Sequence, residues 1–260
     1  MAESRQIPTY PDLAGKVAVV TGGSKGIGAA TCRLLGRQGV AVVVNGRDEA
    51  AIAGLVDEIN GAGGRAIGVA ADCRDFKAIE RVRERAEGEF GPADLLIACA
   101  GGFASYIPAH EISEEEWHAV VDANLTTTFL AVKSFLPGMI ERRRGSIVTM
   151  ASNAARFLDI LTTAPYAASK AAIVMFSRHV AKEVGQYGVR VNCIAPATVL
   201  SDRVLRIMSD ERRQEVAAMA PLGRMGEPED VALATLFLAS DSSSWLTGVT
   251  LDVAGGRIML

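Results

Sequence analysis

Short apolar stretches recur along the chain and alternate with longer segments in which apolar residues return every three or four positions. The short stretches have the length of buried strands, and the longer segments have the spacing of helices that bury one face. Strands buried on both sides and separated by helices are typical of a parallel sheet with helices on both faces. The predicted strands are Val17–Val20, Val40–Val44, Ala66–Ala70, Leu95–Ala98, Ile147–Met150, Val189–Ile194 and Val249–Val253. The pattern therefore predicts an α/β fold, a doubly wound parallel sheet of seven strands.

Local signals also predict where helices begin and how many domains the chain forms. Ser113 and Glu116 have the spacing of a capping box, so we expect one helix from about Glu114 to Arg142. Pro228 suits the first turn of another helix. A chain of 260 residues is long enough for one large α/β domain, and no linker, repeat or low-complexity tract divides it. We therefore expect a polar tail over residues 1–14 and one domain over residues 15–260.

Composition narrows the class of protein. The chain is 49% hydrophobic with a net charge of −3, which indicates neither a nucleic-acid nor a membrane partner. It shows no secretory signal and no apolar run long enough to span a bilayer. The cysteines lack metal-ligand spacing, so we predict free thiols in a reducing compartment, no metal site, and a cytoplasmic protein. These cysteines are Cys32, Cys73, Cys99 and Cys193.

A glycine-rich loop follows the first predicted strand. A loop of this kind before a helix lets backbone N–H groups approach a pyrophosphate, which side chains would block. The alternative is a glycine turn that only allows close packing of strand and helix, but its place after the first strand favours a dinucleotide. The candidate contacts are Thr21, Gly22, Ser24, Lys25, Gly26, Ile27 and Gly28.

The end of the second predicted strand indicates which dinucleotide cofactor the site would bind. Sites for NAD usually place a carboxylate there, to accept hydrogen bonds from the ribose hydroxyls. This chain has Asn45 and Arg47 instead, and Asp48 comes later, where we expect the next helix to start. Arg47 and Lys25 are suited to clamp a 2′-phosphate through charge-assisted hydrogen bonds. Arg47 and Lys25 can also be explained as ordinary surface cations. Because the carboxylate typical of NAD sites is missing at this position, the sequence favours NADP(H).

Tyr166 and Lys170 are four residues apart, so on a helix they share one face. A nearby ammonium stabilises a phenolate, which would make Tyr166 a general acid or base. Alone, the pair is better explained as two neighbouring residues on a helix surface. Ser152, however, follows the predicted strand that ends at Met150, where ligands bind in open α/β sheets. Its hydroxyl is placed to donate to a carbonyl oxygen that gains charge during a reaction.

These motifs, in this order, resemble the short-chain dehydrogenase/reductase family and its 3-oxoacyl-reductase-like branch. The resemblance runs from about Gly15 to Gly256 and implies a Rossmann-type doubly wound sheet of seven parallel strands in a single domain. The matching motifs are Thr21–Gly28, Asp72 with Cys73, Asn124, Ser152, Tyr166 with Lys170, and Val191–Pro196.

The resemblance also implies roles for these residues. Lys170 would hold the nicotinamide ribose, Asn124 would fix a water that links Lys170 to solvent, and Ser152 with Tyr166 would polarise the carbonyl. Two alternatives stay open: Asn124 as a structural amide in a helix bulge, and Asp72 as the N-cap of a helix over about Arg74–Gly88. The remaining implied cofactor contacts are Asp72, Cys73, Ala100, Gly101, Pro196, Val199 and Ser201.

The sequence departs from the family pattern in three places that matter. Ala98 and Cys99 replace two asparagines that tie the centre of the sheet. Ala197 replaces a glycine, so that turn must avoid positive φ or be strained, and Ser201 mildly replaces a threonine that contacts the cofactor. A further difference bears on the substrate. Arg143 matches one of two basic residues that acyl-carrier-protein reductases present to the carrier, but Tyr187 stands where the second is usual.

We expect a substrate lid around residues 200–221 and a mainly apolar pocket. The candidate lining residues are Phe103, Tyr106, Phe157, Leu158, Arg203, Val204, Leu205, Arg206, Ile207 and Met208. The predicted function is NADPH-dependent reduction of a ketone to a secondary alcohol. The alternatives are a 3-oxoacyl-(acyl-carrier-protein) reductase, a sugar or steroid dehydrogenase, and a catalytically silent NADP-binding protein. The resemblance further implies a homotetramer that pairs the helices near Glu114–Arg142 and Pro165–Gln186.

Overall fold

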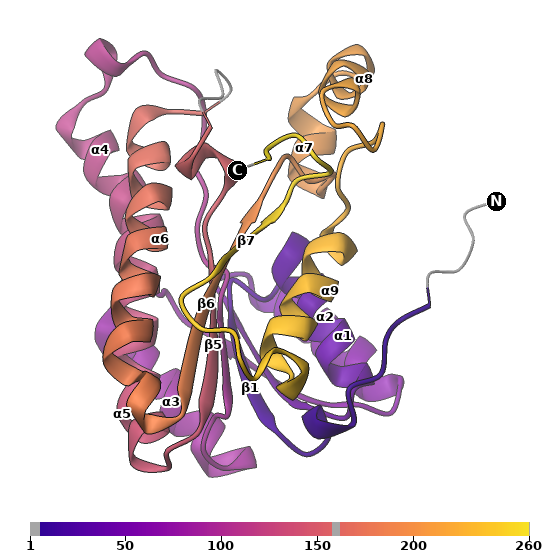
Figure 1. Cartoon of the computed structure of the whole chain (residues 1–260), viewed down its shortest axis with the longest axis vertical. Coiled ribbons are helices and arrows are strands. Elements are labelled where there is room, and N and C mark those ends of the chain that lie inside the picture. Colours follow the sequence, from indigo (N-terminus) through magenta and orange to yellow (C-terminus); the bar gives the residue numbers. More distant parts are fainter. Residues whose placement is uncertain (1–5, 158–161, 260) are drawn as a thin grey trace.

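The strands form one parallel sheet. A computed structural model describes residues 6–157 and 162–259, and in these ranges seven strands lie in the order β3-β2-β1-β4-β5-β6-β7 (Figure 1). The strands are β1 (Val17–Thr21), β2 (Ala41–Gly46), β3 (Arg65–Ala70), β4 (Leu95–Ala98), β5 (Gly145–Met150), β6 (Val189–Pro196) and β7 (Thr250–Val253). All neighbouring pairs are parallel, which confirms the predicted fold class.

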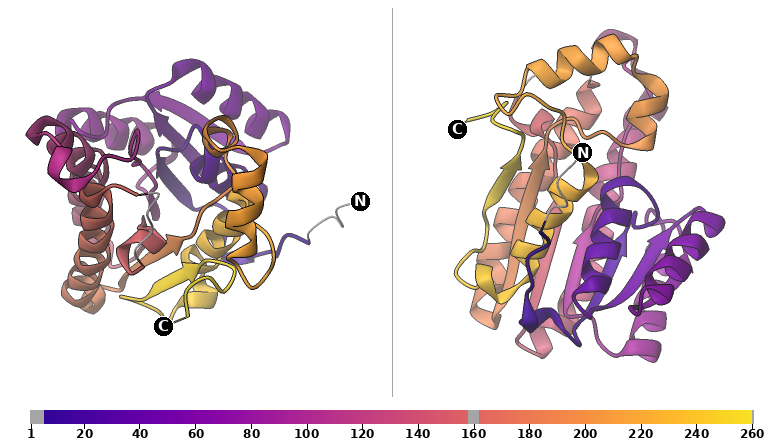
Figure 2. Two further views of the ribbon diagram at one scale, coloured as in Figure 1. Left: turned by 90° about the horizontal axis from the view of Figure 1, so that it is seen from above. Right: turned by 90° about the vertical axis from the view of Figure 1, so that its right-hand side faces the viewer.

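Helices cover both faces of this sheet (Figures 1 and 2). One face packs against α1 (Gly26–Arg37), α2 (Glu49–Gly61) and α9 (Pro228–Ala239). The other packs against α3 (Phe76–Phe90), α5 (Thr127–Glu141) and α6 (Ala164–Val184). Three more helices are α4 (Glu114–Val121), α7 (Asp202–Ile207) and α8 (Asp210–Ala218). The result is a three-layer α/β/α arrangement.

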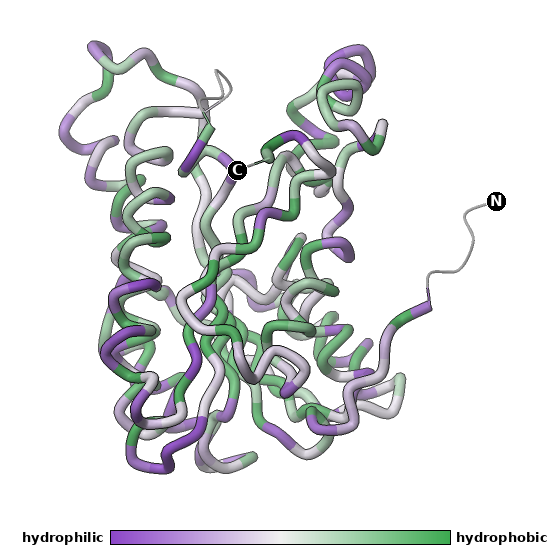
Figure 3. The backbone as a smooth tube through the Cα atoms, viewed as in Figure 1, coloured by the Kyte–Doolittle hydropathy of each residue, from purple (hydrophilic) through white to green (hydrophobic). Residues whose placement is uncertain are grey.

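The alternation of strand side chains explains why two apolar layers form. Ala18 and Val20 of β1 belong to the core that contains α1 and α9, whereas Val19 belongs to the core that contains α5 and α6. Because successive strand residues point to opposite faces, a strand that is apolar at every position can bury both. Figure 3 shows hydrophobic residues concentrated along the strands, while α8 is mostly hydrophilic.

The helix expected from about Glu114 to Arg142 forms over residues 114–141, but it contains a π-helical turn in its interior. The capping box of Ser113 and Glu116 is present, but a π-helical turn at Asp122–Thr126 separates α4 from α5. The amide Nδ2 of Asn124 donates to the Val120 carbonyl at 2.8 Å, within the register of the helix backbone. Side-chain insertion of this kind unwinds the backbone locally, and such bulges are frequent at functional sites.

The carboxyl ends of the strands meet at the upper end of the sheet in Figure 1. The strand order reverses between β1 and β4, which is where open α/β sheets bind ligands. The α7 and α8 helices stand beyond this end, where we expected the lid (Figure 2). At the N-terminus, Ile7 and Tyr10 pack against the core, so the described part of the expected tail is attached to the domain. Within the described residues, no helix has the length and apolarity needed to cross a membrane.

Candidate active site

The glycine loop after β1 has the geometry of a dinucleotide cradle. Gly22 and Gly26 have φ angles of 62° and 52°, a region that favours glycine. A Cβ atom on Gly28 would lie 2.2 Å from the carbonyl oxygen of Gly22, so only glycine lets α1 begin this close to β1. A Cβ on Gly26 would meet only Ser201, at 3.8 Å. The loop thus leaves open the space before α1 that a pyrophosphate needs, and the residues fit such a group.

The loops after β1 and β4 contact each other below this cradle. The backbone N–H of Cys99 donates to the Thr21 carbonyl at 3.2 Å, and that of Ala100 lies 3.4 Å from Thr21 Oγ1. The family asparagines are absent here, yet these main-chain links remain. Burial raises the pKa of the Cys99 thiol to about 12, so the thiol stays neutral.

At the end of β2, the side chains are arranged differently from the expected phosphate clamp. Asn45 has no exposed surface; its amide donates to the Val69 carbonyl at 3.0 Å and its oxygen accepts from the Cys73 thiol at 2.9 Å. Asn45 and Cys73 therefore support the loop from within. Lys25 pairs with the Asp48 carboxylate at 2.6 Å, and Arg47 is exposed. Asp48 caps α2, as expected.

Asp72 does not cap a helix, so that alternative was wrong. The cap of α3 is Asp75, whose carboxylate accepts from the N–H of Lys77. Asp72 instead accepts from the backbone N–H of Arg74 at 2.9 Å and pairs with its guanidinium at 2.6 Å, and this bonding lowers the pKa of Asp72 to about 2. Asp72 stays ionised at neutral pH.

Asn124 is fully buried and clamps the loop after β4. Its Oδ1 accepts from the N–H of Gly102 at 2.9 Å, and its Nδ2 donates to the Gly102 carbonyl at 2.8 Å. With the further bond to Val120, both amide hydrogens are used, which supports the structural alternative. A Cβ on Gly101 would lie 2.6 Å from Oδ1 of Asn124 and 3.3 Å from Nζ of Lys170. Asn124 and Lys170 thus flank the same side of Gly101.

Tyr166 and Lys170 share one face of α6, as predicted. Nζ of Lys170 lies 5.5 Å from the centre of the Tyr166 ring and donates to the Met150 carbonyl at 2.8 Å. Lys170 is 4% exposed, and burial lowers the pKa of its ammonium to about 8. The bond to Met150 joins α6 to the end of β5, two residues before Ser152.

Ser152 lies in the short turn that follows β5. Its hydroxyl accepts from the N–H of Ala154 at 3.2 Å and donates to Oδ1 of Asn153 at 3.1 Å. Within the described part of the chain, Nδ2 of Asn153 is buried and has no hydrogen-bond partner. The turn is anchored by an ion pair of 2.8 Å between Arg156 and Asp252 of β7. Neither Asn153 nor this ion pair was predicted, and the ion pair could not be, because it joins segments that are distant in the sequence.

The segment after β6 closes the site from the other side. Pro196 ends β6, and Val199 bridges to Gly226. Ser201 caps α7 and faces Gly26 of the glycine loop. Ala197 avoids positive φ, since Arg143 is the only non-glycine residue with positive φ in the described ranges. The turn therefore tolerates the loss of the family glycine.

The expected apolar wall is partly visible. Phe103 packs on Tyr166, with ring centres 4.6 Å apart and an angle of 49° between the rings. Tyr106 and Phe157 are exposed, as are Leu205 and Ile207 of α7. Leu158 lies outside the described residues, and so does the side chain of Arg203.

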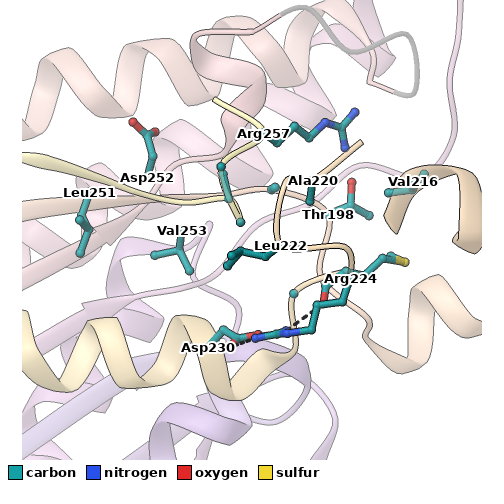
Figure 4. A pocket seen from close by; sticks show the side chains of 16 residues that line it. Thr198, Val216, Ala220, Leu222, Arg224, Asp230, Leu251, Asp252, Val253 and Arg257 are labelled. Carbon is teal, nitrogen blue, oxygen red and sulfur yellow. Dashed lines mark hydrogen bonds and ion pairs between the residues drawn. The ribbon is translucent and has the colours of Figure 1, made fainter. Parts of the chain in front are cut away.

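A separate cavity of about 310 Å³ lies beside β7 and below the lid (Figure 4). Thr198, Val216, Leu222 and Val253 line it, together with the bidentate pair of Arg224 and Asp230. Neither Ser152 nor Tyr166 lines this cavity. The candidate catalytic side chains therefore lie outside this cavity.

Side chains of the types that bind metal ions, including thiols, are dispersed among the described residues. In residues 6–157 and 162–259, no group of three or more His, Cys, Asp or Glu side chains could hold a metal ion. Burial raises the pKa of Cys73 to about 12, as it does that of Cys99, so these thiols remain protonated.

Comparison with known proteins identifies the family. A model of the short chain dehydrogenase family matches residues 16–212. Over 249 residues the chain is 35% identical to 3-oxoacyl-(acyl-carrier-protein) reductase FabG of Vibrio cholerae, which covers 96% of this chain and 100% of the relative. Over 252 residues it is 37% identical to 3beta-hydroxysteroid dehydrogenase 1 of Eggerthella lenta, which covers 96% of each chain.

Solved structures agree with the sequence comparison. A 3-oxoacyl-(acyl-carrier-protein) reductase from Brucella melitensis superposes with a TM-score of 0.94 at 33% identity, covering 100% of this chain and 99% of that one. A second structure from the same organism, with bound NAD, has a TM-score of 0.90 at 32% identity and the same coverage. The chain belongs to the short-chain dehydrogenase family. It is a nicotinamide-dependent oxidoreductase that acts between a secondary alcohol and a ketone.

Proposed function

We propose that the protein reduces a ketone to a secondary alcohol with NADPH, and that Tyr166 is the general acid. The observation that carries this proposal is the position of Lys170, whose buried Nζ lies 5.5 Å from the Tyr166 ring and is held to the end of β5. A screen that follows NADPH absorbance with keto-esters, quinones, 3-oxoacyl thioesters and cyclic ketones tests it. If none of these compounds caused NADPH to be consumed, the proposal would be contradicted.

In this proposal each side chain has a separate task. The bound nicotinamide supplies the hydride. Tyr166 donates its hydroxyl proton to the carbonyl oxygen, and the Lys170 ammonium stabilises the phenolate that remains. The Ser152 hydroxyl turns from Asn153 to the same oxygen and holds it. Asn124 keeps Gly101 and Gly102 in place beside Lys170. The cofactor would lie along the glycine loop, Ala100, Gly101, Pro196, Val199 and Ser201, with Asp72 and Cys73 near the adenine.

A 3-oxoacyl thioester is the second candidate substrate, because it is what the Vibrio relative is named for. In this chain Arg143 donates to the Gln186 carbonyl at 2.8 Å, and its guanidinium lies 5.9 Å from the Tyr187 ring centre. The Arg143 guanidinium therefore already has partners within this chain, although a carrier protein would need it as a contact. This arrangement makes a free ketone the better proposal.

We also propose a homotetramer, as the family resemblance implies. Trp117, Phe129 and Met175 on α4, α5 and α6 are 42%, 44% and 61% exposed. Large apolar side chains on neighbouring helices are typical of a covered surface.

Exchanging Arg47 for aspartate is expected to change which cofactor is used. We expect the unaltered enzyme to favour NADPH over NADH by at least about tenfold in kcat/KM, since a charged hydrogen bond to phosphate is worth that much or more. Arg47→Asp removes the cation and repels the phosphate, so the preference should reverse. Arg37→Asp, the same change at the exposed C-terminal end of α1, is the control.

An unchanged cofactor ratio in Arg47→Asp would contradict the proposed clamp. NAD would then be the better proposal, with Asp48 released from Lys25 to accept from the ribose hydroxyls. A relative with bound NAD shows that this family fold accommodates that cofactor.

Cofactor binding is expected to take up protons above pH 8. Burial holds the pKa of Lys170 at about 8 in the free protein, so the ammonium is partly neutral there. Ribose hydroxyls and cofactor phosphates favour the charged form and raise this pKa. Uptake should therefore reach about three-quarters of a proton near pH 8.5 and nearly vanish near pH 6.5, where Lys170 is already protonated.

Calorimetry in buffers of different ionisation enthalpy measures this uptake. Lys170→Met should abolish its pH dependence, while Lys182→Met, on the exposed surface of the same helix, should not. Equal uptake in Lys170→Met and the unaltered protein would assign the proton to another group.

A further inference from the structure

An aromatic side chain lies against the proposed general acid. The rings of Phe103 and Tyr166 are 4.6 Å apart between centres and inclined by 49°, within the range of favourable aromatic pairs. Phe103 directly follows Gly102, whose N–H and carbonyl are both bonded to the buried Asn124. The backbone immediately before Phe103 is therefore held by Asn124. The aromatic contact therefore lies directly beside the part of the loop after β4 that Asn124 clamps.

Exposed apolar side chains gather at the same edge of the sheet. Seven of the eleven most exposed large apolar side chains of the described residues lie in segments that follow the carboxyl ends of β4, β5, β6 and β7. Four of them form what we call the apolar rim: Tyr106, Phe157, Leu205 and Ile207, which are 58%, 46%, 49% and 66% exposed. Exposed apolar side chains around the carboxyl edge of a sheet are suited to contact an apolar ligand that binds there.

We infer that Phe103 is a specificity-determining residue that selects ketones carrying an aromatic or alicyclic group beside the reacting carbonyl. This inference rests on the proposed role of Tyr166. A carbonyl that reaches the Tyr166 hydroxyl brings its neighbouring substituent to the Phe103 ring, with the apolar rim beyond. An aromatic or alicyclic substituent of the substrate would bury apolar surface against the Phe103 ring. The hydroxyls of a sugar would be desolvated without partners, which disfavours a sugar substrate.

The test uses two keto-esters that differ only in this substituent. Ethyl benzoylacetate carries a phenyl group where ethyl acetoacetate carries a methyl. We expect the unaltered enzyme to favour the phenyl compound by at least about tenfold in kcat/KM. Phe103→Ala should reduce that ratio to within about threefold, mainly by raising KM for ethyl benzoylacetate. Phe103→Tyr, which keeps the ring, should restore the preference.

Phe90→Ala is the matched control, because Phe90 is a half-buried aromatic residue at the far end of α3, packed against Arg65. It should leave the substrate ratio unchanged. Equal or better reduction of ethyl acetoacetate by the unaltered enzyme would overturn the inference, and so would an unchanged ratio in Phe103→Ala. In both cases the proposed reduction of ketones would stand.

A binding measurement separates the inference from turnover. Ethyl 3-phenylpropanoate has the phenyl group and the ester but no ketone, so its binding to the NADP-loaded protein can be followed by calorimetry. We expect Phe103→Ala to weaken this binding by about tenfold and Phe90→Ala to leave it unchanged. If this result appears without turnover of any ketone, the apolar site is supported and the proposed reaction fails.

Discussion

Tyr166→Phe is expected to lower kcat for ketone reduction by about a thousandfold or more, within the range that a lost general acid produces. The substitution removes one hydroxyl and keeps the ring that packs on Phe103 at 4.6 Å. Lys170 keeps its bond to the Met150 carbonyl, so the end of β5 should not move. The dissociation constant for NADPH, measured by its fluorescence, should therefore change by less than about threefold.

Tyr187→Phe is the control for this change. Tyr187 is a half-buried residue next to Arg143, at the opposite end of the sheet from Ser152. Losing its hydroxyl should leave kcat and NADPH affinity unchanged. Turnover by Tyr166→Phe at the unaltered rate would refute the proposed role, and Ser152 would have to be tested as the donor instead. A large loss of NADPH affinity would show that the hydroxyl serves binding more than proton transfer.

The sheet was predictable because its signal is local. Each apolar stretch buries both faces of its own strand. The strand at Val19 could therefore be predicted from β1 alone, without information about the rest of the chain. The glycine loop was predictable for a similar reason. Gly22 and Gly26 adopt positive φ angles and Gly28 allows a close backbone approach, all within one segment of eight residues. Tyr166 and Lys170 are one helical turn apart, so their common face also followed from spacing.

The features that the sequence did not predict depend on contacts between distant segments. A helix bulge at Asn124 was an open alternative from the family resemblance, but the periodicity of apolar residues does not indicate it, because the π-helical turn depends on an amide that reaches both Gly102 and Val120. Lys25 was expected to face a phosphate but meets Asp48, since the end of β2 brings the α2 cap beside the glycine loop. These differences concern side chains that link elements, rather than the elements themselves.

Gly28→Ala and Gly54→Ala are expected to have effects of opposite sign, although both place alanine in a helix. Alanine generally stabilises a helix interior relative to glycine by about 0.5–1 kcal/mol. At Gly54 in α2, a Cβ meets nothing within 4 Å, so we expect a gain of that size. At Gly28, the Cβ would lie 2.2 Å from the Gly22 oxygen and 2.9 Å from Cα of Gly23. Both are backbone atoms, so relief requires the start of α1 to move away from β1.

That movement should cost about 1–3 kcal/mol of unfolding free energy, as overpacking usually does. It should also weaken NADPH binding by about a hundredfold, because the N–H groups that approach a pyrophosphate belong to the displaced segment. Urea unfolding measures the first effect, and NADPH fluorescence measures the second in the folded fraction. Gly54→Ala should bind NADPH normally. If Gly28→Ala also bound NADPH normally, the close approach of α1 to β1 would serve only helix packing, and the pyrophosphate would have to lie elsewhere.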